Sequence, residues 1–226
     1  MTAINRTMSD GVTAALRAAI IEGVYLPGDR LTLKELTGRF DVSATPVRTG
    51  LVNLSNEGLV TLESHRGAFV TPLSAIEIED IFDLRARLEV LAATTAVPNL
   101  TGQEITELRD IADRMQAAEA LSAIVALNNE FHMRLYEPCR RPFLLQVIRS
   151  SRLRVQQYMR WYVRDSHALD AAELEHHEMV DACQTGDVDE IGRLVDHHLR
   201  TAMSYVVEGA RQVAEQADSA REPESV

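Results

Sequence analysis

The sequence predicts a mainly α-helical fold with two domains, an N-terminal winged helix-turn-helix and a C-terminal all-helical bundle of about six helices. Three observations predict it. Residues 33–57 carry apolar side chains at helical spacing on both sides of one short turn, two β-type runs follow Gly58, and helical patterns continue from residue 74. We expect the domains at residues 1–72 and 73–217, with a disordered tail at residues 218–226.

The N-terminal domain is expected to begin with an amphipathic helix from Ser9 to Glu22, with Ser9 as its N-cap. A short second helix runs from Leu33 to Phe40. Residues 41–43 then form a turn, and a third helix follows from Ala44 to Glu57, where Gly58 ends it. The apolar residues of the third helix recur every three or four positions, so its polar residues are left facing outward.

A β-hairpin is expected after the third helix. Its two strands are residues 59–63 and 68–71, and the turn between them is residues 64–67. The short apolar stretch at residues 30–32 can pair with this hairpin as a third strand. The hairpin would be the wing of the domain.

Four polar residues are expected on or near the outward face of the third helix: Thr45, Arg48, Thr49 and Asn53. A polar helix that follows a tight turn is the geometry that enters a DNA major groove. At the tip of the wing, His65 and Arg66 can reach a phosphate or a minor groove. The alternative without a binding function is a small helical subdomain on which Arg48 and Arg66 are exposed to solvent and contact no ligand. A helix pair with its turn and hairpin together favours DNA binding.

The net charge of −11 is unevenly distributed along the chain. Up to Pro72 there are seven Lys or Arg and seven Asp or Glu, so the N-terminal domain is neutral and the remainder carries the negative charge. This balance is compatible with DNA binding through a local patch. Because Lys34 is the only lysine, phosphate contacts must come from arginine, backbone amides and helix N-termini.

Several protein classes are disfavoured. No apolar run is long enough to span a bilayer and no signal peptide is evident, so we expect a cytoplasmic protein without a membrane partner. Cys139 and Cys183 form no CxxC pair, which argues against a disulfide framework and against a thiolate metal site. No nucleophile elbow, P-loop or dinucleotide fingerprint occurs.

The C-terminal domain is expected to be a helical bundle that begins after Pro72. Pro98, Pro138 and Gly186 separate the helices. Capping boxes at Ser74, Thr101 and Asp187, each with Glu three residues later, open three of them. The expected helices are Ser74–Val97, Gly102–Glu119, Leu121–Tyr136, Pro142–Val163, Asp170–Gln184 and Val188–Ala217.

Four residues in this bundle have a spacing that can bind metal. Asn128 and His132 share a helix face, while His176 and His198 come from two later helices, so three imidazoles and an amide oxygen can converge on a divalent cation. The alternative is that the doublets His176-His177 and His197-His198 are solvated or helix-terminal. A metal-dependent hydrolase using the three histidines with Glu175 or Glu178 is a competing hypothesis. However, His177-Glu178-Met179-Val180-Asp181 lacks the second His of a zincin motif.

Four motifs in order carry a resemblance to a known family. They are PGDRL at residues 27–31, VSATPVR at 42–48, EGLV at 57–60 and RGAFV at 66–70. With them the N-terminal domain resembles that of GntR-family transcription regulators. Ala44 stands where members usually have Arg, and Thr49-Gly50 where they have Glu-Ala, so the operator is expected to differ from the family's commonest one. The expected DNA contacts are Arg30, Thr45, Arg48, Thr49, His65, Arg66 and Gly67.

The C-terminal domain resembles the FCD ligand-binding domain of the FadR-like subfamily. The matching residues are Leu84-Arg85-x-x-Leu88-Glu89, Asn128-x-x-Phe131-His132, Glu175-His176 and His197-His198-Leu199. The resemblance implies a divalent metal, Zn²⁺ or Ni²⁺, held by Asn128, His132, His176 and His198, although Asp is the commoner first ligand. It also implies that Arg85 binds an effector carboxylate. An ion pair between Arg85 and Glu89 is the alternative, and Arg152 or Arg154 can also line the pocket.

These expectations together describe a ligand-responsive transcription regulator that is not an enzyme. We expect a homodimeric repressor that reads a palindromic operator in double-stranded DNA. A small carboxylate metabolite bound at the metal site would alter the placement of the two DNA-binding domains. A regulator with the metal itself as effector is a further alternative.

Overall fold

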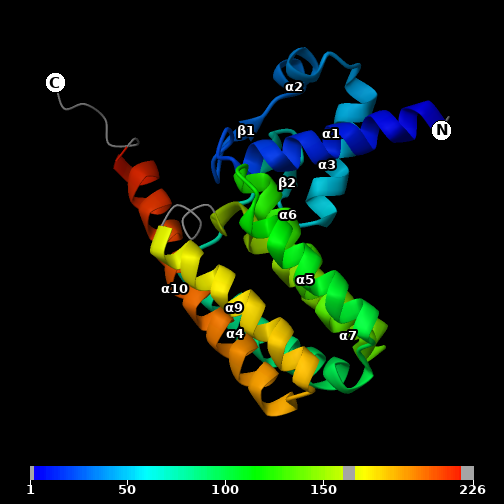
Figure 1. The fold of residues 1–226 in the computed structure, drawn as a ribbon. Coiled ribbons are helices and arrows are strands. Elements are labelled where there is room, and N and C mark those ends of the chain that lie inside the picture. The colour runs from blue at the N-terminus through cyan, green and yellow to red at the C-terminus, as the bar shows by residue number, and fades with distance from the viewer. Residues whose placement is uncertain (1–2, 160–165, 220–226) are drawn as a thin grey trace. The chain divides into compact units, whose positions relative to one another are not determined.

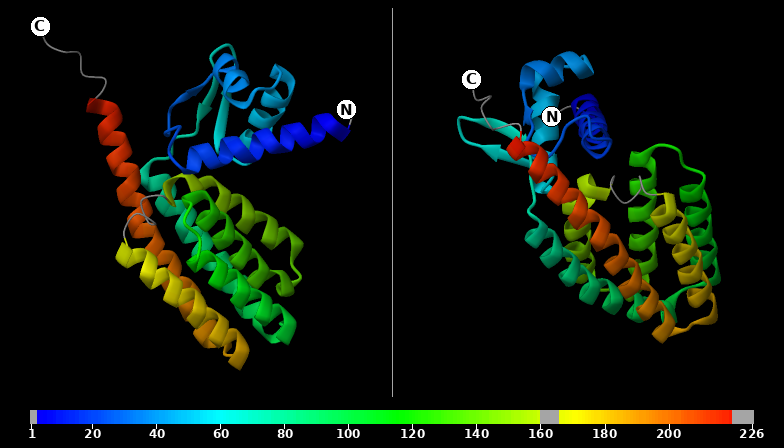
Figure 2. Two further views of the ribbon diagram at one scale, coloured as in Figure 1. Left: turned by 45° about the horizontal axis from the view of Figure 1, so that its top comes forward. Right: turned by 90° about the vertical axis from the view of Figure 1, so that its left-hand side faces the viewer.

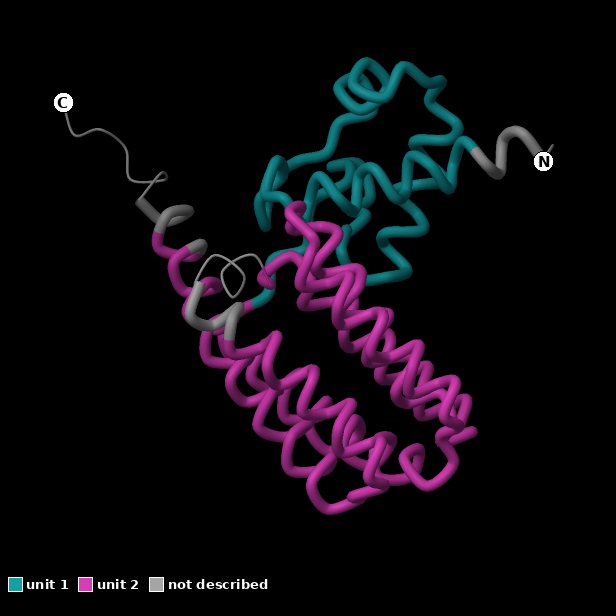
Figure 3. Tube along the Cα trace, viewed as in Figure 1, with its two compact units in different colours: residues 1–73 teal, residues 74–226 magenta. Residues whose placement is uncertain are grey.

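The computed structural model describes residues 3–159 and 166–219. Contacts divide the chain into two compact units, Met1–Leu73 and Ser74–Val226 (Figure 3). The first unit combines helices with a small sheet and the second is helical (Figure 1), which confirms the predicted fold class. Among the described residues, no helix combines the length and the apolar character needed to cross a membrane.

The first unit contains three helices, α1 (Ala3–Ile21), α2 (Leu33–Phe40) and α3 (Ala44–Asn56). The bounds of α2 are as predicted, but α1 begins well before Ser9. Neither Pro nor Gly lies between residues 3 and 8 to stop the helix, and Ser9 is buried within it instead of capping it. The backbone carbonyl of Ser9 accepts a hydrogen bond from the Thr13 hydroxyl at 2.7 Å.

Helix α3 packs closely against α1. A Cβ on Gly50 would lie 3.1 Å from Cγ1 of Val12, so the absence of a side chain at Gly50 allows the two helices to approach. On the same side of α3, the Asn53 side-chain amide donates to the Thr13 hydroxyl at 3.2 Å. Asn53 is therefore directed toward α1 and not toward solvent.

The sheet has three antiparallel strands in the order β1-β3-β2. They are β1 (Arg30–Leu31), β2 (Val60–Glu63) and β3 (Gly67–Val70), with Arg30 opposite Phe69 and Val60 opposite Val70. The turn at the hairpin tip uses positive φ angles, 65° at His65 and 109° at Gly67. The predicted hairpin and third strand are thus present: β1 and β2 are each one residue shorter than expected, and β3 is shifted by one residue toward the N-terminus.

The second unit is a bundle of α-helices linked by short 3₁₀ turns. Helix α10 packs along α4, and α5 packs against both α6 and α9 (Figure 2). The helices are α4 (Ala75–Ala96), α5 (Gly102–Gln116), α6 (Leu121–Tyr136), α7 (Pro142–Val155), α9 (Ser166–Thr185) and α10 (Val188–Ser219), with 3₁₀ turns at Val97–Asn99, Glu137–Cys139 and Gln156–Tyr158.

The helix starts in this unit follow the capping signals closely. Both hydrogen bonds of a capping box form at Ser74 and at Thr101. At Asp187 only one forms, because the carboxylate of Glu190 pairs with Arg193 instead of returning to the cap.

Four predicted helix ends in this unit were wrong by more than one residue. Helix α5 stops at Gln116, α7 gives way to a 3₁₀ turn after Val155, and α9 begins at Ser166 instead of Asp170. Helix α10 continues to Ser219, so residues 218 and 219 are helical and not part of a tail. Residues 160–163 of the predicted helix and 220–226 of the predicted tail lie outside the described residues.

Candidate metal centre and nucleic-acid interface

His132 of α6, His176 of α9 and His198 of α10 converge inside the second unit. One ring nitrogen from each lies within 4.8 Å of the others, and all three side chains are buried. The Nε2 atoms of His132 and His176 are 3.4 Å apart. Two imidazole nitrogens on one tetrahedral Zn²⁺ are separated by about 3.4 Å, so this pair already has the spacing of metal ligands.

A hydrogen-bond chain fixes the tautomer of His132. The Tyr136 hydroxyl donates to the Glu89 carboxylate at 2.9 Å, so its oxygen accepts from Nδ1–H of His132 at 3.1 Å. The pKa of Tyr136 is raised well above its usual value by burial and then by Glu89, which keeps this hydroxyl protonated. The lone pair of His132 is therefore on Nε2, the atom that faces the other histidines.

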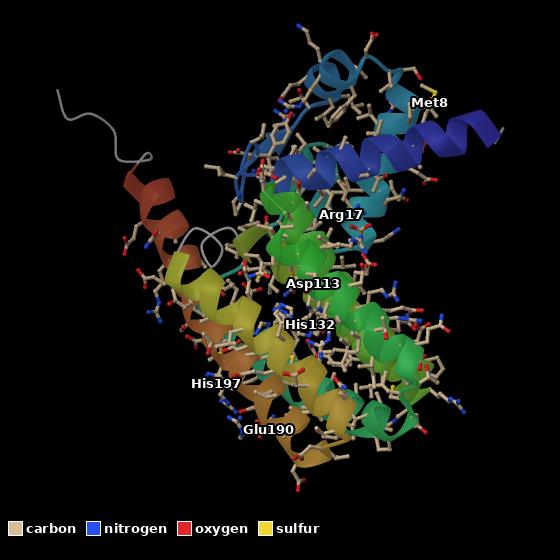
Figure 4. All side chains as sticks on the ribbon, viewed as in Figure 1. Met8, Arg17, Asp113, His132, Glu190 and His197 are labelled. Carbon is tan, nitrogen blue, oxygen red and sulfur yellow. The ribbon has the colours of Figure 1, made fainter. Side chains whose placement is uncertain are left out.

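His198 is oriented in the same way by a carboxylate. Its Nδ1 lies 2.6 Å from an oxygen of Glu175, which is itself buried. Because a carboxylate accepts, Nδ1 of His198 donates to Glu175, and Nε2 is the ring nitrogen that this contact leaves available. His197, the other member of the doublet, is exposed and lies 3.4 Å from the second oxygen of Glu175. Figure 4 labels His132 among the helices and His197 on the outside.

Burial keeps two of the three imidazoles neutral. It lowers the pKa of His132 and of His176 well below the usual value of 6.5, with neighbouring positive groups acting in the same direction. The Ala172 carbonyl opposes this effect at His176, although Nδ1 of His176 forms no hydrogen bond of normal geometry. Neutral imidazoles are the form that binds a metal ion.

Beside the triad lies a buried charge cluster centred on Glu89. Its carboxylate receives Nε of Arg85 at 2.7 Å and Nη1 of Arg152 at 2.7 Å. Burial disfavours the charged form of Glu89, but the two guanidiniums outweigh it and hold its pKa below the usual value. Two buried arginines facing one carboxylate leave one positive charge in excess, which suits an anionic ligand.

A pocket opens next to this cluster, and Arg85, Asn128, Arg152, Gln156 and His198 are among the residues that line it. Arg85 therefore both forms the ion pair with Glu89 and faces the pocket. Of the two further arginines considered from the sequence, Arg152 lines the pocket, while Arg154 is exposed.

The residues expected to contact DNA lie on α3 and the wing of the first unit. Thr45 and Arg48 are exposed on α3, and Thr49 is half-buried with its hydroxyl bonded to the Thr45 carbonyl. Between α3 and the wing runs a groove whose lining includes Arg30, Arg48 and Gly67.

Two more of these residues lie at the wing tip. His65 and Arg66 are exposed there, and Arg66 pairs with Glu63 at 2.6 Å. The Arg66 guanidinium also lies over the ring of Phe69, 5.7 Å from its centroid. The two units thus hold separate candidate sites, one exposed and one buried.

Comparison with known proteins assigns both units. Residues 8–70 match the family described as bacterial regulatory proteins, gntR family, and residues 80–201 match the FCD domain. The chain belongs to the GntR family. It is a GntR-family transcriptional regulator with an FCD domain, and this architecture fits the FadR-like subfamily.

Individual relatives agree with this assignment. The Nta operon transcriptional regulator of Aminobacter aminovorans is 35% identical over 144 residues, which cover 62% of this chain and 69% of that protein. The transcriptional repressor RspR of Escherichia coli is 24% identical over 206 residues, covering 89% and 88%. The solved structure of E. coli McbR/YncC shares the fold with a TM-score of 0.73 at 20% identity, covering 96% of this chain and all of that one.

The relatives and the fold of this GntR-family regulator are those of transcription regulators and not of enzymes, so the hydrolase alternative is set aside. Sequence reasoning gave Glu89 only as a partner of Arg85 and missed the other residues that support the site: Asn129, Tyr136, Glu175 as a partner of His198, and Gln156. Tyr136 had a detectable signal, because it lies one helical turn after His132. The contacts of Asn129, Glu175 and Gln156 in the site join separate helices, so no spacing within one helix predicts them.

Proposed function

We propose that this GntR-family regulator is a homodimeric repressor whose operator affinity is set by a small organic acid bound beside a divalent metal ion. The histidine triad carries this proposal. One ring nitrogen from each of three buried histidines lies close to the others, and such nitrogens suit a Zn²⁺ or Ni²⁺ ion.

The operator would be read by α3 and the wing. Arg48 and Thr45, which are exposed on α3, would contact base edges in a major groove, while Arg30, His65, Arg66 and the backbone at Gly67 would contact phosphates or a minor groove. Thr49 supports Thr45 on the same helix face. The repressor assignment is supported by RspR, a relative whose name is that of a repressor.

The effector would be a carboxylate. Arg85 faces the pocket, and Glu89 takes only its Nε atom among the hydrogen bonds of the described residues, so its two terminal nitrogens are available to a bidentate carboxylate. Arg152 contributes its charge, but its nitrogens already bond Glu89, Asn128 and Asn129. The metal would supply a Lewis acid that binds the same ligand.

A second copy of the chain would cover α4. Leu84 and Leu91 lie seven residues apart on this helix and are 45% and 41% exposed, a spacing that forms one apolar stripe. A twofold dimer can match a palindrome whose half-sites lie about 34 Å apart. Leu84→Glu should convert the dimer to a monomer in sedimentation velocity. Leu174→Glu, at an exposed leucine of α9, should not, and an equal effect of both would contradict this interface.

The proposed function is tested by fluorescence anisotropy on the DNA upstream of the chain's own gene, with and without chelator and with a panel of organic acids. Arg48→Ala should weaken specific binding by about 1–3 kcal/mol. Arg193→Ala removes the same charge from an exposed ion pair of the second unit and should leave binding unchanged. His176→Ala should abolish the response to acids.

Two outcomes would change the conclusion. Operator affinity that follows the metal alone, with no acid effective, would assign the metal itself as effector. Absence of any sequence preference in the DNA binding of the wild-type protein would overturn the proposal.

A further inference from the structure

Asn128 is the residue of the proposed metal set whose side chain does not match a ligand. Its Nδ2 lies 3.2 Å from Nε2 of His176, and its Oδ1 lies 2.7 Å from Nη2 of Arg152. The amide thus spans from the charge cluster to the triad, with nitrogen on the metal side. An amide nitrogen is a donor and has no lone pair for a metal ion.

The hydrogen-bond partner Arg152 determines which of the two amide atoms of Asn128 is the oxygen and which is the nitrogen. A guanidinium has only donors, so the atom of Asn128 that faces Arg152 must be the oxygen. Arg152 cannot turn away easily, because Nε donates to Asn129 at 3.0 Å and Nη1 to Glu89 at 2.7 Å, and its side chain is only 4% exposed. Reversing the amide would set two donors against each other in a buried place.

The remaining hydrogen of the amide then points at His176. Because Nδ2 can only donate, Nε2 of His176 must accept, so its lone pair is engaged by the protein itself. This is the same lone pair that a metal ion needs. His132 and His198 are supported differently, since their partners bond Nδ1 and leave Nε2 available.

We propose that Asn128 is not a metal ligand in this chain but a hydrogen-bond donor, anchored by Arg152, that competes with the metal for Nε2 of His176. This inference rests on the metal site proposed above. The metal is held by three imidazoles, and every remaining coordination position is open to the effector or to water. Asp at this position would remove the competing donor and add an anionic ligand, so Asn128 sets metal affinity lower than the same site with a carboxylate.

The test is a competition titration of the full-length, chelator-treated protein with Zn²⁺ alone and with Ni²⁺ alone. Asn128→Ala should tighten binding about 2- to 10-fold, because one hydrogen bond no longer has to be broken. Asn128→Asp should tighten it by roughly tenfold or more. Asn99→Ala is the matched control, because it removes an exposed amide that bonds the Thr95 carbonyl and belongs to neither the triad nor the charge cluster, and it should leave the affinity unchanged.

A second readout uses no metal. In ¹⁵N spectra of the metal-free protein, Nε2 of His176 should be unprotonated and Nδ1 should carry the proton. Thermal melts followed by circular dichroism check that each variant is folded. A proton on Nε2 of His176 would overturn the inference directly.

The outcomes separate this inference from the proposed metal site. If His176→Ala abolishes binding and Asn128→Ala weakens it roughly 10- to 100-fold relative to Asn99→Ala, Asn128 is a ligand, and only the inference fails. If the wild type binds no metal while Asn128→Asp does, the blocking role of Asn128 is supported in its strongest form. Absence of binding in both proteins overturns both proposals.

Discussion

Polar side chains in the two units differ in how exposed they are and in whether they form hydrogen bonds. In the first, Arg66 is 72% exposed at the wing tip, and Ser43, the N-cap residue of α3, makes no capping hydrogen bond with its side chain. In the second, Arg152 is 4% exposed and bonded through all three nitrogens, and Ser74 forms a complete capping box.

This difference matches what each unit is proposed to bind. DNA offers phosphates and base edges over a wide surface, so donors are best left in water, where DNA can reach them. A small acid must be held in one geometry, which requires donors fixed by a surrounding network. We therefore expect buried, hydrogen-bonded polar side chains to contribute most to the stability of the second unit. Exposed polar side chains should contribute most to DNA binding by the first unit.

The largest effect should come from Glu89→Gln. This change leaves two buried guanidiniums without their shared counter-charge and should lower the free energy of unfolding by roughly 3–5 kcal/mol. Urea denaturation followed by circular dichroism measures it. Glu190→Gln breaks an exposed ion pair and should cause no measurable change. Similar losses in the two variants would contradict the difference expected between buried and exposed ion pairs.

A pH effect should come next. Burial lowers the pKa of His132 and His176 in the folded protein, while the unfolded chain titrates near 6.5. Below that pH the unfolded chain binds protons that the folded one does not, so stability falls as pH falls toward the lowered values. Between pH 7.5 and 5.5, the metal-free protein should lose about 1.4 kcal/mol per histidine. Denaturation at the two pH values measures the loss, which His176→Asn should roughly halve.

Loss of a helix cap should have a smaller effect. Ser74→Ala removes both a cap to the Glu77 backbone and the partner of the Glu77 carboxylate, and should lower stability by about 1 kcal/mol. Ser43→Ala is the matched change in the first unit and should have little effect on stability, because its side chain makes no cap bond. Equal melting shifts in the two variants would show that both units depend on their caps.

The smallest effect on folding should come from Arg66→Ala. Its ion pair with Glu63 is exposed and contributes little to stability. On DNA, loss of one phosphate contact should reduce the slope of log affinity against log salt by about 1, with similar weakening for all sequences. Anisotropy at several salt concentrations measures this slope, and an unchanged slope would remove Arg66 from the interface.

The sequence predicted periodic and local features well. The bounds of α2 and α6, the wing and two capping boxes all follow from spacing within one segment. Gly50 shows where such reasoning fails. Its low helix propensity predicts only that it weakens α3. In the fold, its missing side chain lets α1 approach closely, which the sequence of α3 alone cannot show.

The candidate site was predictable to the same extent. Its histidines belong to family motifs, and the structure brings all three together. The Oδ1 atom of Asn128 is engaged by Arg152, a residue of another helix whose position no periodicity reveals. Networks of this kind are specified by tertiary packing, so they emerge only once the helices are placed.

Glu89 connects the histidine triad to the charge cluster beside the pocket. Through Tyr136 it supports His132 of the triad, and through Arg85 and Arg152 it balances the charge of the pocket. A ligand that draws Arg85 away changes the field felt by the hydroxyl behind His132. If the proposed acid and metal both bind, thermodynamic reciprocity requires that the acid changes metal affinity by the same factor as the metal changes acid affinity. The free metal concentration of the cell would thus set the acid concentration at which the regulator responds.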